Sequence, residues 1–213
     1  MVRGFFITIE GIEGSGKSTQ MGLLSEHLEK KGMEVVALRE PGGTALGDSI
    51  RSILLNSGGS KIVSEAELLL YEASRAQLVK LVIRPALEAG KTVICDRFTD
   101  STVAYQGYGR GLDIDAINLI NHSATGGLTP DVTLLIDLDP GEGLRRAWSR
   151  ISRKEGEKED RFEKEDIPFH RRVRAGYLKI AGREPGRVKV INGDGEIHSI
   201  HREICDIMNK MTS

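Results

Sequence analysis

Residues 11–19, Gly-Ile-Glu-Gly-Ser-Gly-Lys-Ser-Thr, could bind the phosphates of a nucleotide. They match the pattern G-x-x-x-x-G-K-[ST], in which glycines let backbone N–H groups turn around a phosphate. Lys17 could then reach the β- and γ-phosphates, and the Ser18 hydroxyl could bind Mg²⁺. The alternative is a chance match in a glycine-rich turn. We predict that the whole loop binds ATP, namely Gly11, Ile12, Glu13, Gly14, Ser15, Gly16, Lys17, Ser18 and Thr19.

An acid and a base stand side by side at Asp96 and Arg97, directly after the apolar residues 92–95. In a phosphate-loop protein, the end of an apolar strand is where a carboxylate directed at Mg²⁺ is expected. The guanidinium of Arg97 could grip a phosphate with two N–H groups. The alternative is a local ion pair between the two side chains.

Tyr71 and Arg75 are four residues apart in a helical pattern, so they share one face of that helix. An aromatic ring beside a guanidinium could stack on a nucleobase and donate hydrogen bonds to its edge. The alternative is a surface tyrosine, with Arg75 paired to Glu72 three residues before it.

Short apolar stretches that read as strands alternate with helical patterns along the whole chain. This alternation predicts an α/β fold, a phosphate-loop three-layer sandwich with a five-stranded parallel sheet and helices on both faces. Ligands bind beyond the carboxyl ends of such strands, where the loop at 11–19 and Asp96 both fall. The predicted strands are residues 5–10, 34–39, 91–96, 132–138 and 187–191.

Several helix boundaries can be predicted from individual residues. Ser64 and Glu67 have the spacing of a capping box, and Pro85 should kink or divide the helix that follows, at 64–89. Asp139 more naturally caps the next helix than forms a second acid pair with Asp137. Residues 107–111 are expected to form a mobile basic loop.

Residues 145–166 alternate basic and acidic side chains, and almost none of them suits a hydrophobic core. The usual explanation is a solvated helix face with many ion pairs. After the fourth strand of a phosphate-loop fold, the run could instead be a mobile lid, at about residues 150–164. Its closure would bring arginines to the transferred phosphoryl group and exclude water.

The composition restricts the class of protein. The 213 residues predict a single domain over 1–213, and the net charge of −1 gives no electrostatic case for binding nucleic acid. Because no apolar run has the length of a membrane span, we expect neither a membrane anchor nor a signal peptide. Cys95 and Cys205 lack metal-ligand spacing, and we expect structural thiols in a reducing cytoplasm.

Taken together, these motifs resemble the thymidylate kinase family, in particular its bacterial type with a catalytic lid. They occur in the order of the family over nearly the whole chain: residues 11–18, 39–44, Tyr71 with Arg75, 96–98, 104–107 and 160–163. The resemblance implies transfer of the γ-phosphoryl group of ATP to dTMP, with Mg²⁺ as cofactor. It also implies a cytoplasmic homodimer.

The resemblance also implies a role for each matching residue. Glu13 would face the 3′-hydroxyl of dTMP, Tyr71 would stack on thymine, and Arg75 would donate to a thymine carbonyl. Arg97 would hold the dTMP phosphate, and Tyr105 would disfavour a ribose 2′-hydroxyl. The other implied dTMP contacts are Arg39, Pro41, Ser101, Thr102 and Gln106.

The phosphate loop has no basic residue at positions 12–15, where some members of the family carry an arginine. The resemblance therefore implies that Arg150, Arg153 or Arg161 of the lid supplies this charge, alongside the catalytic Lys17. Ser18 and Asp96 would be the metal site. Three alternatives remain: a kinase for another small acceptor, a nucleotide-dependent switch, and a domain that binds nucleotide without catalysis.

Overall fold

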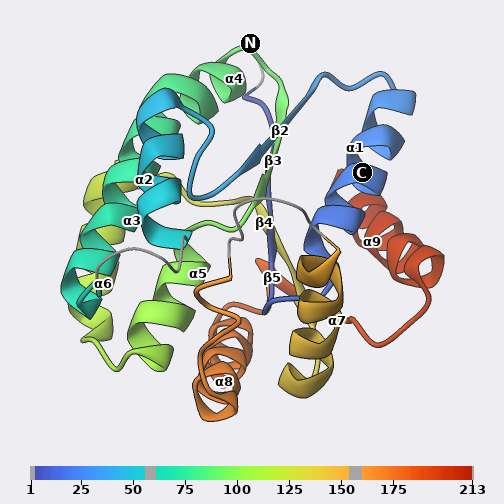
Figure 1. Ribbon diagram of the computed structural model, residues 1–213. Helices are drawn as coiled ribbons and strands as arrows, with labels where there is room; N and C mark the ends of the chain where they lie inside the picture. Colours follow the sequence, from blue (N-terminus) through green and yellow to red (C-terminus); the bar gives the residue numbers. More distant parts are fainter. Residues whose placement is uncertain (1–2, 56–60, 154–159, 213) are drawn as a thin grey trace.

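The computed structural model describes residues 3–55, 61–153 and 160–212, so residues 154–159 of the predicted lid lie outside it. Within these ranges the chain forms one five-stranded, all-parallel sheet with helices on both faces (Figure 1). This confirms the predicted fold. In spatial order the strands are β2 (Val35–Arg39), β3 (Thr92–Asp96), β1 (Phe6–Glu10), β4 (Val132–Asp137) and β5 (Val188–Asn192).

The strand register brings the carboxyl ends of the inner strands to one edge of the sheet. Ile9 of β1 pairs with Asp96 of β3, and Asp96 also pairs with Arg39 of β2. All five residues of β1 are buried, whereas the edge strand β2 is largely exposed or half-buried. Apolar, β-branched residues suit the inner strands because both of their faces are covered.

Two layers of helices cover the sheet. On one face, α1 (Lys17–Lys30) and α9 (Ile197–Thr212) pack against it through a cluster that includes Leu24, Leu28 and Ile204. A second cluster, with Leu78, Ile83 and Phe98, lies on the opposite face. The remaining elements are α2 (Ala45–Leu55), α3 (Ser64–Leu78), η1 (Val79–Ile83), α4 (Arg84–Glu88), α5 (Thr99–Thr102), η2 (Val103–Gly109), α6 (Ile114–Thr125), α7 (Pro140–Ser152) and α8 (Ile167–Arg183).

Two of the predicted helix boundaries are confirmed and one is wrong. Pro85 interrupts the long helix, since η1 is a π-helical segment and α4 starts just before Pro85. Asp139 caps α7 by accepting from the backbone N–H of two residues. The capping box is wrong: Val63 is the N-cap of α3, and the side chain of Glu67 accepts from Gln106 and Arg110 instead.

Two expectations about irregular segments are also corrected. The segment 107–111 is not a separate loop, because the π-helix η2 continues through Gly109. Within 145–166, the side chains of Ile151 and Phe162 are buried, and Phe162 belongs to a core cluster with Tyr105 and Phe169. This charged run therefore contributes to the core through Ile151 and Phe162, whereas Trp148 is 40% exposed. No helix of the described segments is long and apolar enough to span a membrane.

Leu24→Ala should lower the free energy of unfolding by about 2–5 kcal/mol, because the side chain is fully buried between α1 and the sheet. The matched control is Leu178→Ala on α8, where the side chain is 38% exposed and the loss should be about 1 kcal/mol or less. Urea unfolding followed by circular dichroism measures both. Equal losses would contradict the assignment of this core.

Candidate active site

The phosphate loop has the strand–loop–helix setting that its sequence predicts. β1 ends at Glu10, α1 begins at Lys17, and the loop between them contains three glycines with positive φ, at positions 11, 14 and 16. Gly14 has φ 70°, and a Cβ there would lie 2.0 Å from the carbonyl oxygen of Gly143. Gly16 has φ 97°, a conformation that other residues rarely adopt. The loop geometry therefore depends on these glycines.

The amino end of α1 offers donors for an anion. Gly16 is the N-cap and makes no side-chain cap hydrogen bond, so the first N–H groups of the helix have no side-chain acceptor there. The Oγ atom of Ser15 is buried and has no hydrogen-bond partner among the described residues. Nζ of Lys17 donates to the carbonyl oxygen of Ile12 over 2.7 Å, an acceptor that a phosphate oxygen could replace. The arrangement suits a bound phosphate group.

A cavity of about 400 Å³ opens at the carboxyl edge of the sheet beside this loop. It joins the phosphate loop to the residues of the predicted nucleotide-acceptor pocket. Its wall includes these predicted site residues: Glu13, Gly14, Lys17, Ser18, Arg39, Pro41, Tyr71, Asp96, Arg97, Ser101, Thr102, Tyr105, Gln106 and Arg150. The predicted residues that do not line it are Gly11, Ile12, Ser15, Gly16, Thr19, Arg75, Arg153 and Arg161.

Arg97 is held in a fixed position within this cavity. It is the one non-glycine among the described residues with a left-handed backbone, at φ 73°. Its guanidinium donates to the hydroxyls of Ser101, Tyr105 and Tyr177 at 3.1–3.2 Å and to Glu13 at 3.0 Å. Burial alone would lower the pKa of Arg97, but these oxygens outweigh it and raise the pKa above its usual range. The cavity therefore contains a permanent, oriented cation.

Glu13 remains charged although it is 9% exposed. Burial alone would raise its pKa, but a contact with His170 and the charge of Arg97 outweigh that effect and lower the pKa to about 2. One carboxylate oxygen accepts from Tyr105 over 2.5 Å, and the other lies 3.3 Å from Nδ1 of His170. Glu13 and Arg97 thus keep each other ionised.

Glu10 is a second buried acid, and sequence reasoning missed it. It accepts from the backbone N–H of Phe98 and from the hydroxyls of Ser101 and Tyr177, at 2.7–2.8 Å. The hydroxyls of Ser101 and Tyr177 also accept from Arg97, so Glu10 holds in place two of the groups that bind the guanidinium. A signal was available, because Glu10 ends an apolar strand as Asp96 does.

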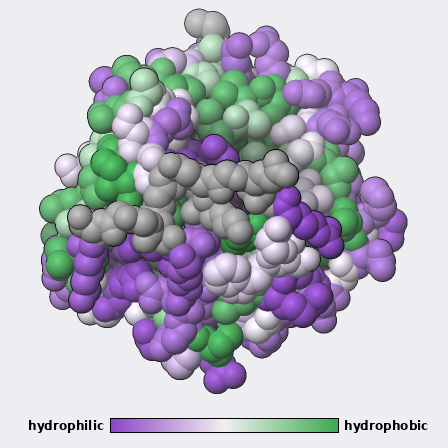
Figure 2. All heavy atoms as spheres, viewed as in Figure 1, coloured by the Kyte–Doolittle hydropathy of each residue, from purple (hydrophilic) through white to green (hydrophobic). Residues whose placement is uncertain are grey.

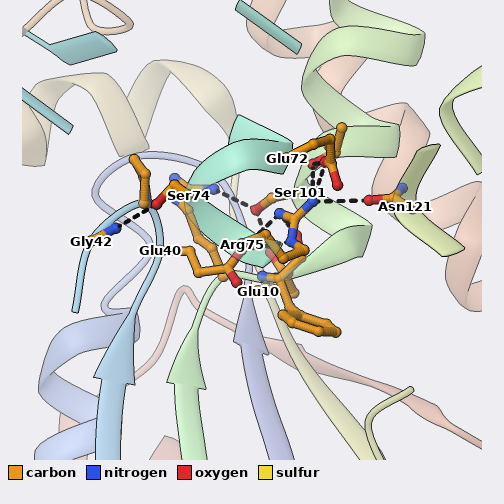
Figure 3. A network of polar contacts seen from close by, with 12 residues as sticks. Glu10, Glu40, Gly42, Glu72, Ser74, Arg75, Ser101 and Asn121 are labelled. Carbon is orange, nitrogen blue, oxygen red and sulfur yellow. Dashed lines mark hydrogen bonds and ion pairs between the residues drawn. The ribbon is translucent and has the colours of Figure 1, made fainter. Parts of the chain in front are cut away.

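Arg75 lies behind the cavity wall rather than in it. Its side chain is 1% exposed, and all of its N–H groups face acceptors in the protein (Figure 3). Glu72 and Glu40 bind it as ion pairs, and its other acceptors are Thr102, Asn121 and the carbonyl oxygen of Phe98. This favours the alternative in which Arg75 pairs with Glu72 over the implied contact with thymine. Burial raises the pKa of Glu40 to about 7, against the opposing charge of Arg75.

Ser18 and Asp96 meet where a cation could sit. The Oγ atom of Ser18 donates to one carboxylate oxygen of Asp96 over 2.9 Å. The other oxygen, Oδ1, is buried without a hydrogen-bond partner among the described residues. A hydroxyl and an unsatisfied carboxylate oxygen next to a phosphate loop are a donor set that fits Mg²⁺.

The three arginines of the predicted lid lie in different surroundings. Arg150 lines the cavity, and its guanidinium is 3.7 Å from Glu163. Arg161 does not line the cavity, and its guanidinium binds Glu67 and the carbonyl oxygen of Leu54. Arg153, the C-cap of α7, is exposed and does not line the cavity. The geometry favours Arg150 among the three.

Arg51 and His170 are among the further residues at the site that were not predicted. Arg51 of α2 lines the cavity and donates to the carbonyl oxygen of Pro41. His170 of α8 contacts Glu13. Arg51 could have been noticed in the sequence, because it is a basic residue next to Ile50 in a largely apolar helical segment. For His170 there was no such signal, because its contact spans more than 150 residues of sequence.

Comparisons with known proteins agree with this geometry. A family model described as thymidylate kinase matches residues 9–204. The chain belongs to the thymidylate kinase family. It is 55% identical over 194 residues to thymidylate kinase of Citrifermentans bemidjiense, covering 91% of this chain and 86% of the relative. The corresponding values for the Geobacter sulfurreducens thymidylate kinase are 49% over 205 residues and 96% of each chain.

A solved structure leads to the same family. The crystal structure of thymidylate kinase from Ehrlichia chaffeensis superposes with a TM-score of 0.77 at 36% identity. The match covers 97% of this chain and 99% of the other. As a member of the thymidylate kinase family, the protein is an enzyme, a kinase of nucleotide biosynthesis.

The pH dependence of catalysis should report Lys17. Burial, with the charge of Arg97 added, lowers its pKa to about 8 in the free enzyme. The ammonium is therefore lost as pH rises through about 8, and kcat/KM for ATP should fall there. A bound phosphate favours the ammonium, so the corresponding fall in kcat should come at higher pH. Tyr105 and Tyr177 have raised pKa values and do not titrate in this range. A flat kcat/KM profile up to about pH 10 would contradict this account.

Proposed function

We propose that this cavity holds ATP and dTMP together and that the residues of its wall carry out the reaction of the family. The protein transfers the γ-phosphoryl group of ATP to dTMP, giving dTDP and ADP. The observation that carries the proposal is the single cavity in which Lys17, Arg97 and Tyr71 all line the wall. A phosphate-binding loop, a second fixed cation and an aromatic ring are what two nucleotides require.

The donor side is the phosphate loop. Its backbone N–H groups and the amino end of α1 bind the phosphates of ATP, and Lys17 exchanges the carbonyl of Ile12 for a phosphate oxygen. Ser18 and Asp96 hold Mg²⁺, which when bound would neutralise charge on the β- and γ-phosphates. Gly11, Ile12, Ser15, Gly16 and Thr19 shape the loop.

The acceptor side is the wall around Arg97. Arg97 binds the dTMP phosphate, aided by Arg39 and the turn at Pro41, and Tyr71 stacks on thymine. Glu13 orients Arg97 and faces the 3′-hydroxyl. The remaining contacts, from Ser101, Thr102, Tyr105 and Gln106, surround the sugar and base. Arg75 acts as a positioning residue, because it holds Thr102 of this wall.

No protein nucleophile is needed, because a phosphate oxygen of dTMP attacks the γ-phosphorus in line. Catalysis then consists of positioning and of neutralising charge. Arg150 is suited to the transferred group because it lines the cavity from the end of α7. Closure of the segment at about 150–164 as a lid would exclude water, which competes with dTMP as acceptor.

A coupled assay of ADP release tests this function. With ATP and Mg²⁺, we expect turnover with dTMP and little with UMP, dCMP, AMP or no acceptor. Lys17→Ala should depress kcat with both substrates saturating. Faster turnover of dCMP or thymidine would keep phosphoryl transfer but discard the thymine site at Tyr71. Slow hydrolysis independent of acceptor would favour a nucleotide-dependent switch.

The lid arginines provide a matched pair of variants. Arg150→Ala should lower kcat by about 10²-fold or more, because a cation at the transferred phosphoryl group is lost. Arg153→Ala, three residues away and outside the cavity, is the control and should keep kcat within about threefold. The opposite order of effects would assign the role to Arg153.

We further propose a homodimer through the neighbouring helices α2, α3 and α6. Large apolar side chains on these helices and on η1 are at least half exposed, namely Leu46, Ile53, Leu69, Leu81 and Leu119. Hydrophobic residues lie on the left of Figure 2, over these helices. Monomers rarely expose so many large apolar residues in one region.

The two free cysteines fit the cytoplasm, where we place the enzyme.

Leu119→Glu should convert the dimer to a monomer, because a charge would be buried at the interface in two copies. Leu178→Glu, on α8 away from these helices, is the control and should leave the mass unchanged. Light scattering after size exclusion measures the mass. A wild-type monomer at micromolar concentration would contradict the proposal.

A further inference from the structure

Three side chains with metal-binding atoms meet on the side of the sheet away from the cavity. His27 lies near the end of α1, and His201 and Cys205 lie one turn apart on α9. A ring nitrogen of each histidine and Sγ of Cys205 all lie within 4.8 Å of one another. Nothing in the reaction of the kinase uses these residues.

The distances are close to those of a coordination sphere. Sγ of Cys205 lies 3.4 Å from Nε2 of His201. In a tetrahedral zinc site, bonds of about 2.1 and 2.3 Å place such a nitrogen and sulfur about 3.6 Å apart. The rings of His27 and His201 have centroids 5.9 Å apart at an interplanar angle of 82°, so neither ring stacks over the other. Small rotations of the side chains would complete the sphere.

One nitrogen of the cluster lacks a protein partner. Nε2 of His27 is buried and has no hydrogen-bond partner among the described residues. A buried ring nitrogen normally has a partner, and a metal ion would supply one. The helices that carry the cluster are already tied together, since Lys31 donates to Asn209 and Gln20 donates to the carbonyl oxygen of Ile197. The cluster therefore lies at a contact between α1 and α9 that already exists without a metal ion.

Burial affects the protonation of all three side chains. Burial lowers the pKa of His27, and the positive charges of Lys31 and Lys30 lower it further. Burial likewise lowers the pKa of His201, together with the neighbouring His27 and His198. Neutral imidazoles are the form that binds metal. Burial and Asp206 raise the pKa of the Cys205 thiol, and Lys31 opposes them, so a metal must displace its proton. The charge of Glu26 acts in the opposite direction and raises the pKa of His201.

We propose that His27, His201 and Cys205 form a binding site for a divalent metal ion of the zinc class. Two imidazoles and one thiolate give the ion three protein ligands, and water takes the fourth position of the tetrahedron. The ion joins α1 to α9. Because α1 also carries Lys17 and Ser18 at its other end, the site steadies the helix on which the phosphate loop depends.

Co²⁺ titration of the reduced, nucleotide-free chain tests the site, with excess Mg²⁺ present to occupy the oxygen ligands of the nucleotide site. Cobalt bound by a thiolate gives a near-ultraviolet charge-transfer band, which oxygen ligands do not. We expect the band to saturate at one Co²⁺ per chain and to disappear on addition of Zn²⁺. Absence of the band would overturn the proposal.

Three variants locate the ligands. Cys205→Ser should abolish the band, and His27→Gln should weaken Co²⁺ binding by at least about tenfold. His198→Gln, on the same helix and exposed, is the matched control and should bind Co²⁺ as the wild type does. Kinase activity without added Zn²⁺ should be unchanged in all three, which verifies their folding. Full binding by His27→Gln would overturn a site that joins the two helices.

A measurement on the wild type alone provides a second test. Zn²⁺ should protect Cys205 from alkylation and raise the midpoint of thermal unfolding, as any ligand specific to the folded state does. Cys95 is fully buried in β3 and should not react in either condition. Alkylation of Cys205 at the same rate with and without Zn²⁺ would contradict the proposal.

Discussion

Holding two polyanionic nucleotides together demands cations that stay charged and fixed inside a protein, and this demand shapes the molecule. A guanidinium removed from water is costly unless carboxylates and hydroxyls surround it. Arg97 meets this condition through Glu13 and three hydroxyls. Glu13 in turn is kept ionised by Arg97 and by its contact with His170. Each charge therefore helps to stabilise the other, together with the neighbouring side chains that both of them contact.

The sheet supplies the framework for this pair. Parallel strands end at one edge, so Glu10, Arg39 and Asp96 come together although they are far apart in sequence. The left-handed backbone at Arg97 turns the chain just past β3, and the hydroxyls that hold its guanidinium come from α5, η2 and α8. A second buried arginine, Arg75, joins α3 to the same wall through Thr102. The cavity is therefore built from fixed charges on rigid elements, as preorganised catalysis requires.

The strands, the phosphate loop and the pair Asp96–Arg97 could be predicted from local patterns in the sequence, whereas most of the acceptor side of the cavity wall was expected from the resemblance to the family. Apolar runs define the strands, and the topology of a parallel sheet then places whatever follows each strand at one edge. Contacts set by distant segments could not be predicted this way. The capping box at Ser64 failed because Glu67 has stronger partners in η2 and in Arg161. The burial of Arg75 and the contact of His170 with Glu13 likewise depend on packing between elements.

The central claim is that Arg97 is the preorganised cation for the acceptor phosphate. Calorimetric titration of the protein with dTMP and with thymidine, which lacks that phosphate, tests it most directly. The account predicts that Arg97→Ala weakens dTMP binding by about 2–5 kcal/mol and leaves thymidine binding nearly unchanged. Equal weakening of both ligands, or of neither, would contradict it.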